Sequence, residues 1–321
     1  MRRKARSPIA LILAGVLACS LGHRMRAEQQ TAATSTLDES VPPGENYDKA
    51  NFRLWYPSDI ATFDAVLVLV PGSNGDGRGD VGDPFWQQFA TKHKLAIVGC
   101  QITDKPHDQG FIEDYANVSH GSGQALLTAL QALAKRANHP EIANAPLLLW
   151  GMSAGGEFDY EFAAWKPERV IAFIVNKGNI YYTALASREA RNVPAILFTG
   201  EKDLEFRTNT INGLFAVNRR GGALWALAQE PGIGHAVGRS KELGAMFFED
   251  VLPLRLGGPV TNGQTVLRPL DEKMGFIGDQ KTLTYQPVAS AGPVNAPASW
   301  LPTARIAHAW QAVVTGRPFD F

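Results

Sequence analysis

The chain has 321 residues, of which 45% are hydrophobic and 19% charged, which is enough apolar material for one large α/β domain with short extensions. Its 31 basic and 31 acidic residues balance, and residues 1–19 hold four of the basic and none of the acidic ones. The rest of the chain is therefore mildly acidic. This excludes a nucleic-acid partner from the expected functions, because such a partner requires a basic face.

The N-terminus has the pattern of an export signal. Four basic residues precede an uncharged stretch from Pro8 to Gly22, which is too short to span a bilayer comfortably as a helix. We therefore predict a signal peptide over residues 1–27, no membrane span, and a periplasmic or secreted protein. Residues 16–19 are similar to a bacterial lipoprotein box, so a lipid anchor at Cys19 is the alternative to ordinary cleavage.

Residues 28–48 are predicted to form a flexible leader, because they are mostly polar and present no apolar face that could be buried. Beyond the leader, aliphatic runs alternate with helical patterns. This alternation predicts right-handed crossovers and a mostly parallel sheet, with a ligand site at the carboxyl ends of its strands. Strands are expected over 51–57, 65–70, 95–101, 146–150, 170–175, 194–200 and 223–229, and helices over 85–89, 122–134, 157–165 and 241–254. Ser122 is expected to cap its helix.

The strand over 146–150 leads into Gly151-Met152-Ser153-Ala154-Gly155, which has the form Gly-x-Ser-x-Gly. A serine becomes a nucleophile when a base takes its proton and a tight turn presents its Oγ, and small neighbours leave room for such a turn. The backbone N–H of Ala154, at the start of the next helix, points where a carbonyl oxygen would become an anion. Because the motif also occurs by chance, an ordinary glycine-rich turn is the alternative.

Candidate partners for Ser153 follow later strands. A serine nucleophile needs a base, and the base needs a carboxylate that orients it. Of the seven histidines, His235 lies in a glycine-flanked loop after a late strand, and Asp203 directly follows the strand over 194–200. Glu201 and Glu205 are the alternative acids. Ser122, which follows His120 closely, is interpreted as structural because it begins a helix.

The loop over 71–82 follows the strand over 65–70, and its glycines allow backbone N–H groups to approach a ligand closely. Three of the glycines match Gly-x-Gly-x-x-Gly, but six loop residues separate them from the strand, which disfavours a dinucleotide site. Three aspartates over 76–83 do not have EF-hand spacing, so a solvated loop is favoured over a calcium site.

Four of these features together resemble the α/β-hydrolase superfamily: the glycine loop, the Gly-x-Ser-x-Gly turn, Gly200 to Asp203, and Gly234-His235. The order Ser153, Asp203, His235 is that of the family's triad. The resemblance covers about residues 50–256 and implies an α/β-hydrolase fold with a mostly parallel central sheet and helices on both faces. Only fifteen residues separate Gly178 from Pro194, so no large lid domain is expected.

The resemblance also implies that the glycine loop supplies the second oxyanion donor, from the N–H of Ser73 or of Asn74. The family's secreted esterases usually have His-Gly where this chain has Pro71-Gly72. The chain looks most like the secreted polyhydroxybutyrate-depolymerase and feruloyl-esterase-like esterases. This implies hydrolysis of small-molecule or polymer-linked carboxylic esters without a metal or organic cofactor, and it indicates no oligomeric state.

Two other functions remain open on the same fold. A peptidase of the prolyl-oligopeptidase type usually carries a large N-terminal propeller, for which this chain is too short. A catalytically silent binding protein is the second. We assign residues 49–256 to the catalytic domain and residues 257–321 to a C-terminal extension packed on it. Trp300 and Trp310 would be costly to expose, so we expect the extension to bury them, either in the substrate pocket wall or over the outer helices.

Overall fold

The computed structural model describes residues 33–261, 263–292 and 297–319. The predicted signal peptide and Cys19 lie outside these residues. Within the described ranges, no helix is long and apolar enough to cross a bilayer.

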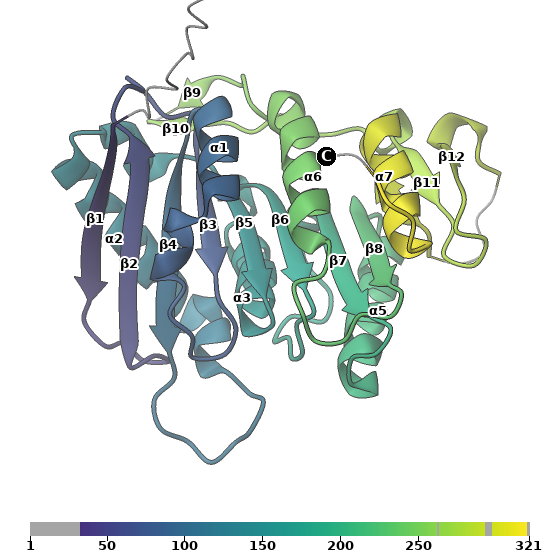
Figure 1. The fold of residues 1–321 in the computed structure, drawn as a ribbon, viewed down its shortest axis with the longest axis horizontal. Helices are drawn as coiled ribbons and strands as arrows, with labels where there is room; N and C mark the ends of the chain where they lie inside the picture. The colour runs from purple at the N-terminus through teal and green to yellow at the C-terminus, as the bar shows by residue number, and fades with distance from the viewer. Residues whose placement is uncertain (1–32, 262, 293–296, 320–321) are drawn as a thin grey trace, which may run out of the picture. The chain divides into compact units, whose positions relative to one another are not determined.

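The centre of the fold is an eight-stranded sheet in the order β1-β2-β4-β3-β5-β6-β7-β8 (Figure 1). β1 and β2 pair antiparallel, β2 pairs antiparallel with β4, and the remaining pairs are parallel. The mostly parallel sheet predicted from the sequence is therefore confirmed. The strands are β1 (Thr34–Val41), β2 (Lys49–Pro57), β3 (Ala65–Val70), β4 (Leu95–Thr103), β5 (Leu147–Met152), β6 (Val170–Asn176), β7 (Ala195–Gly200) and β8 (Trp225–Glu230).

Helices cover both faces of this sheet, which explains why its inner strands are aliphatic throughout. In β3, Val66 and its alternate neighbours pack with α2 (Ser122–Ala137), α3 (Ala154–Trp165) and α5 (Glu205–Arg220). Leu67 and its alternate neighbours pack on the other face with α1 (Pro84–Lys92), α6 (Ser240–Arg255) and α7 (Ala304–Val314). Figure 1 shows α1 and α6 in front of the sheet and α3 behind it. The short α4 (Arg188–Arg191) is the helix between β6 and β7.

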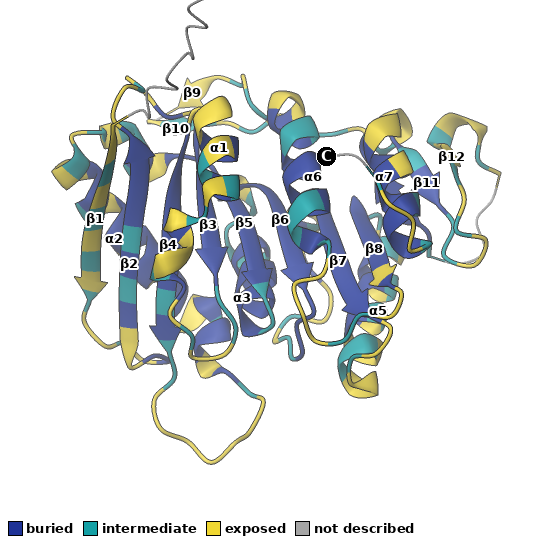
Figure 2. Cartoon of the chain, in the orientation of Figure 1, coloured by how far each residue is buried: buried dark blue, intermediate teal, exposed yellow. Residues whose placement is uncertain are grey.

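Strand β1 corrects the prediction of a flexible leader over residues 28–48, of which 28–32 lie outside the described residues. It pairs with β2 along its whole length, and its side chains alternate between exposed and half-buried (Figure 2). Two ion pairs hold it: Asp38 with Arg53 at 2.7 Å, and Glu39 with Arg136 at 2.8 Å. Because β1 buries no apolar face fully, hydrophobic periodicity could not reveal it.

The end of the same segment also corrects the expected helix cap. α2 begins at Ser122, but the Ser122 side chain does not cap it, because its buried Oγ donates to the Tyr115 carbonyl oxygen at 2.6 Å. The Asn46 Oδ1 accepts from the Ser122 N–H at 3.0 Å instead. The polar segment before β2 is thus tied to the domain by its own side chains.

The C-terminal extension forms a three-stranded antiparallel sheet of β11 (Phe276–Gly278), β12 (Tyr285–Pro287) and β13 (Ser299–Leu301), followed by α7. The hairpin of β9 (Val260–Thr261) and β10 (Gln264–Thr265) precedes it. β13 and α7 contact β8, the last strand of the large sheet. There Trp310 is fully buried, and its Nε1 donates to the Leu227 carbonyl oxygen at 2.7 Å, while Ser299 Oγ accepts from the Leu227 N–H at 2.8 Å.

Candidate active site

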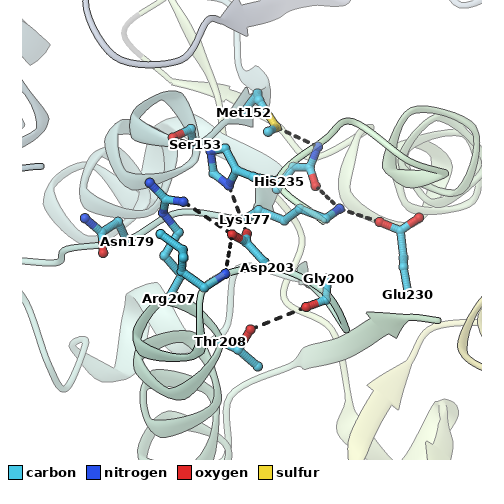
Figure 3. Close-up of polar contacts among 12 residues, drawn as sticks. Met152, Ser153, Lys177, Asn179, Gly200, Asp203, Arg207, Thr208, Glu230 and His235 are labelled. Atoms are coloured by element: carbon cyan, nitrogen blue, oxygen red, sulfur yellow. Dashed lines mark hydrogen bonds and ion pairs between the residues drawn. The ribbon is translucent and has the colours of Figure 1, made fainter. Parts of the chain in front are cut away.

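Three of the predicted site residues meet at the edge of the sheet where the parallel strands end. Ser153 follows β5, Asp203 follows β7 and His235 follows β8. His235 Nε2 lies 3.0 Å from Ser153 Oγ, and His235 Nδ1 lies 2.9 Å from Asp203 Oδ2 (Figure 3). The structure therefore places a hydroxyl, an imidazole and a carboxylate in one hydrogen-bonded series.

The turn that carries Ser153 is strained and closely packed. Ser153 has a φ of +55°, which a residue with a side chain rarely adopts. A Cβ on Gly155 would collide with the carbonyl oxygen of Val70, and one on Gly151 would collide with the backbone of Gly155. The turn is also bound to the end of β6, because the Ser153 N–H donates to the Asn176 carbonyl oxygen at 2.8 Å. Both glycines of the motif are therefore required by the packing.

Asp203 is held as a carboxylate by three donors. Its Oδ2 pairs with His235, and its Oδ1 accepts from the Leu204 N–H at 2.7 Å and from Arg207 Nη1 at 3.3 Å. Burial would raise the pKa of Asp203, but these hydrogen bonds outweigh it and lower the pKa below its ordinary value. Asp203 is thus suited to orient the imidazole and to stabilise its protonated form.

The two alternative acids lie elsewhere. Glu201 Oε2 accepts from the Gly232 N–H at 2.6 Å, so it anchors the loop that carries His235. Glu205 is exposed at the first residue of α5.

A buried ion pair supports the other end of the His235 loop, and no sequence motif indicated it. Lys177 Nζ, directly after β6, pairs with Glu230 Oε2 at the end of β8, and both side chains are buried (Figure 3). Glu230 Oε1 accepts from the Arg239 N–H at 2.6 Å. Burial lowers the pKa of Lys177, while the neighbouring Glu230 acts to raise it. The loop from 231 to 239 is therefore fixed at both ends.

The two candidate oxyanion donors on the glycine loop differ in their surroundings. The loop passes close to the nucleophile, since a Cβ on Gly72 would lie 3.5 Å from that of Ser153. Burial raises the pKa of the Tyr115 hydroxyl well above its ordinary value, and the Asn74 backbone acts in the opposite direction. Ser73 lines the cavity beside the nucleophile. The N–H of Ser73 or of Asn74 stays the predicted second donor, which would complement Ala154, whose N–H begins α3.

A cavity of about 720 Å³ opens beside these residues. Its wall comes from three short segments and three further side chains: Gly72, Ser73 and Gly75; Gly110, Phe111 and Glu113; Met152, Ser153 and Glu157; and Asn179, Arg207 and His235. The sequence did not single out Glu157, Asn179 or Arg207. For Glu157 the sequence held one signal: α3 contains three acidic residues, although its remaining side chains are nearly all apolar, which is unusual for a helix packed on a sheet.

The expectation that the extension forms part of the pocket wall is wrong for its described residues, none of which lines this cavity. The extension instead supports the His235 loop from outside. Arg239 Nη1 donates to the Arg317 carbonyl oxygen at 2.6 Å, and its guanidinium lies 3.8 Å from the centre of the Phe319 ring.

No protein-family model and no curated protein matches this sequence. Among solved structures, the chain is similar to a ferulic acid esterase, with 12% identity over 68% of this chain and 98% of that one and a TM-score of 0.51. It is also similar to LpqC, a poly(3-hydroxybutyrate) depolymerase from Bordetella parapertussis, with 18% identity over 67% of this chain and 87% of that one and a TM-score of 0.48. A bacterial heroin esterase is similar with 16% identity over 70% of this chain and 87% of that one and a TM-score of 0.49. The sheet order and the first similarity confirm the predicted α/β-hydrolase fold.

Proposed function

We propose that this chain, which has the α/β-hydrolase fold, hydrolyses carboxylic esters with Ser153 as the nucleophile, His235 as the general base and Asp203 as the acid that orients the base. One observation carries the proposal: both ring nitrogens of His235 are hydrogen-bonded, Nε2 to Ser153 Oγ at 3.0 Å and Nδ1 to Asp203 Oδ2 at 2.9 Å. This arrangement fixes the tautomer that can accept the serine proton. The names of the similar solved structures, esterases among them, agree with this class of reaction.

The chemistry follows from these positions. Ser153 Oγ attacks the ester carbonyl carbon while its proton passes to His235 Nε2. When the C–O bond to the alcohol breaks, the leaving oxygen takes that proton. Water then attacks the acyl-enzyme, giving its proton to His235, and the acid is released as Ser153 is regenerated.

Two backbone groups would stabilise the oxyanion formed in both steps. The Ala154 N–H lies at the N-terminus of α3, where the helix dipole favours negative charge, and the glycine loop, on which Ser73 lines the cavity, would supply the second N–H. Asp203 remains ionised throughout and stabilises the imidazolium that forms between the steps.

The substitution Ser153→Ala tests the proposal. Turnover of p-nitrophenyl acetate should fall by about 10⁴-fold or more, as expected when a triad nucleophile is removed. A fluorophosphonate should add one label to the wild type and none to Ser153→Ala, whereas Ser119→Ala, which changes an exposed serine, should label as the wild type does. Turnover that survives Ser153→Ala, or a wild type that stays unlabelled, would leave a binding protein on this fold as the better description.

A further inference from the structure

Three side chains that line the cavity each carry a buried polar atom without a partner. Glu157 Oε2, Asn179 Oδ1 and Arg207 Nε are buried and have no hydrogen-bond partner among the described residues. All three side chains line the cavity beside Ser153. Buried polar atoms without partners are uncommon in native proteins, and each one calls for an explanation. Three in one cavity wall point to a ligand that supplies the missing partners.

The rest of each side chain is fixed by the protein. Glu157 Oε1 accepts from the Asn179 N–H at 2.5 Å, and Asn179 Nδ2 donates to the Phe111 carbonyl oxygen at 3.0 Å. Arg207 Nη1 donates to Asp203 Oδ1 at 3.3 Å, and in the view of Figure 3 Arg207 lies between Asn179 and Asp203. The unpaired atoms are therefore held in position before any ligand arrives.

The position of Glu157 relates this group to the reacting carbon. Ser153 is the N-cap of α3, and Glu157 follows it by four residues. Residues four apart on a helix lie on the same face, with a rise of about 6 Å between them. The bound part of the substrate would thus lie about one helical turn from the ester carbonyl.

We propose that Glu157, Asn179 and Arg207 form a subsite that binds a hydroxyl group of the ester substrate, an inference that rests on the esterase function proposed above. A hydroxyl group both donates and accepts hydrogen bonds. Asn179 Oδ1 can only accept, and the Arg207 Nε–H can only donate. The subsite therefore offers the hydroxyl both kinds of partner.

Glu157 completes the subsite as a second donor. Burial and the neighbouring Glu113 raise the pKa of Glu157 to about 8, so its carboxyl group is neutral at pH 7. Because Oε1 already accepts from the Asn179 N–H, the proton belongs on Oε2, the atom without a partner.

Other ligand chemistries fit these residues less well. A carboxylate would face the Glu113 side chain, which also lines the cavity, and the Asn179 oxygen. A cation would face the Arg207 guanidinium. An alkyl group would leave all three polar atoms unpaired, and its van der Waals contacts would not offset the free-energy cost of burying them.

Aromatic side chains at the same position suit the carbon skeleton that would carry the hydroxyl group. Phe111 lines the cavity and is 60% exposed, and its ring centre lies 6.1 Å from that of Phe206, which is 45% exposed. Phe111 has a φ of +63°, a conformation that costs energy for a bulky residue, and Asn179 holds its carbonyl group. The chain thus keeps an apolar ring at the mouth of the cavity at a cost to the backbone.

Matched esters that differ by a hydroxyl group test the subsite in the wild type. On the acyl side, methyl 3-(4-hydroxyphenyl)propanoate is compared with methyl 3-phenylpropanoate. In both esters two methylene groups separate the carbonyl from the ring, so the ring hydroxyl does not change the reactivity of the carbonyl. On the alcohol side, 2,3-dihydroxypropyl butyrate is compared with propyl butyrate. In one of the two pairs, kcat/KM for the hydroxylated ester should be about 10-fold to 100-fold higher. That pair identifies the part of the substrate that carries the hydroxyl, and equal values within both pairs would overturn the inference.

Variants of Glu157 identify the residue responsible. Glu157→Gln keeps an acceptor at Oε1 and a donor in place of Oε2, so the preference should persist, whereas Glu157→Met should reduce it to about 1-fold. The matched control is Glu161→Met, one turn further along α3, because Glu161 is fully paired with the Tyr182 N–H, the Thr183 N–H and the Thr183 hydroxyl. A preference that survives Glu157→Met, or one that Glu157→Gln abolishes, contradicts the donor role. If Glu157→Met does not fold, the kcat/KM values of the wild type for the matched ester pairs still test the subsite.

The same measurements separate this inference from the proposed function. Wild-type protein that hydrolyses p-nitrophenyl acetate and reacts with the fluorophosphonate, yet shows no hydroxyl preference, refutes the subsite alone. Protein that does neither refutes the esterase function itself.

Discussion

The C-terminal extension and the cavity beside Ser153 differ in how their buried polar groups are paired. In the extension, Trp300 Nε1 donates to the Glu272 carbonyl oxygen at 3.0 Å, and Trp310 Nε1 donates to a carbonyl oxygen of β8 at 2.7 Å. Among its described residues, no buried side-chain nitrogen or oxygen lacks a partner. This is the pattern expected of a segment that packs on the domain and stabilises it.

At the cavity the pattern is the opposite. Three lining side chains keep an unpaired polar atom, and three residues around the nucleophile have positive φ: Asn74 at +52°, Phe111 at +63° and Ser153 at +55°. Unpaired groups and strained backbone both cost stability; they also occur elsewhere, as at Arg169 Nε and at Leu283 of the extension, but here three of each kind gather around the nucleophile. We therefore expect a separation of roles, in which substitutions at the cavity act on catalysis and substitutions in the extension act on stability.

The largest effect is expected at the acid of the site. Asp203→Asn should lower kcat by about 10⁴-fold, because an amide no longer selects the His235 tautomer that accepts the serine proton. Glu201→Gln is the matched control and should cost far less, since its amide oxygen can still accept from the Gly232 N–H. Rates on p-nitrophenyl acetate compare the two. Small and equal losses would mean that the acid lies elsewhere.

In the extension, Trp310→Ala should act on stability. The side chain is fully buried against β8 and α6, and removing such a tryptophan costs about 3–5 kcal/mol of the free energy of unfolding. Relative rates across a panel of p-nitrophenyl esters of increasing acyl length should stay unchanged, because Trp310 is outside the cavity wall. Denaturant unfolding and the ester panel measure both quantities. A shifted acyl preference with little loss of stability would contradict the separation.

The smallest effect is expected at Asp159, which lies on α3 behind the site. Its side chain is fully buried, both oxygens lack partners among the described residues, and burial raises its pKa well above 3.8. The folded state therefore holds a proton that the unfolded state releases above about pH 4, so wild-type stability falls as the pH rises toward the folded-state pKa.

Asp159→Asn removes this titration. The variant should gain about 1–3 kcal/mol over the wild type at pH 8 and much less at pH 5. Thermal unfolding at the two pH values measures the difference. An identical gain at both would show that the Asp159 carboxyl does not change its charge between the folded and unfolded states.

The sequence predicted the elements that follow a regular pattern. Aliphatic runs indicated the inner strands because these are buried on both faces, and the residues of the hydrogen-bonded series were found because each one ends a strand within a recognisable motif. Ser153, Asp203 and His235 lie far apart in sequence, yet parallel strands bring their carboxyl ends to the same edge of the sheet.

What the sequence missed depends on contacts between distant segments. Glu157 reads as an ordinary helix residue, and its unpaired oxygen arises only because Asn179 binds the other one. Lys177 and Glu230 are 53 residues apart and meet only when β6 and β8 lie beside β7. β1 was missed because its backbone pairing with β2 leaves no sequence pattern and its apolar side chains Leu37 and Val41 are only partly buried.

The contacts between the extension and β8 have a consequence for solubility. The last strand of an open sheet presents unpaired N–H and C=O groups, which invite a strand from another molecule and lead to aggregation. At Leu227 these groups are already bound, the N–H by Ser299 Oγ and the carbonyl oxygen by Trp310 Nε1 and Gln280 Nε2. At the opposite border of the sheet, β1 carries Asp38 and Glu39, whose charges discourage such pairing. Side chains of the extension thus bind the backbone of one border strand at Leu227, as a neighbouring strand would, and charged side chains lie on the other border strand.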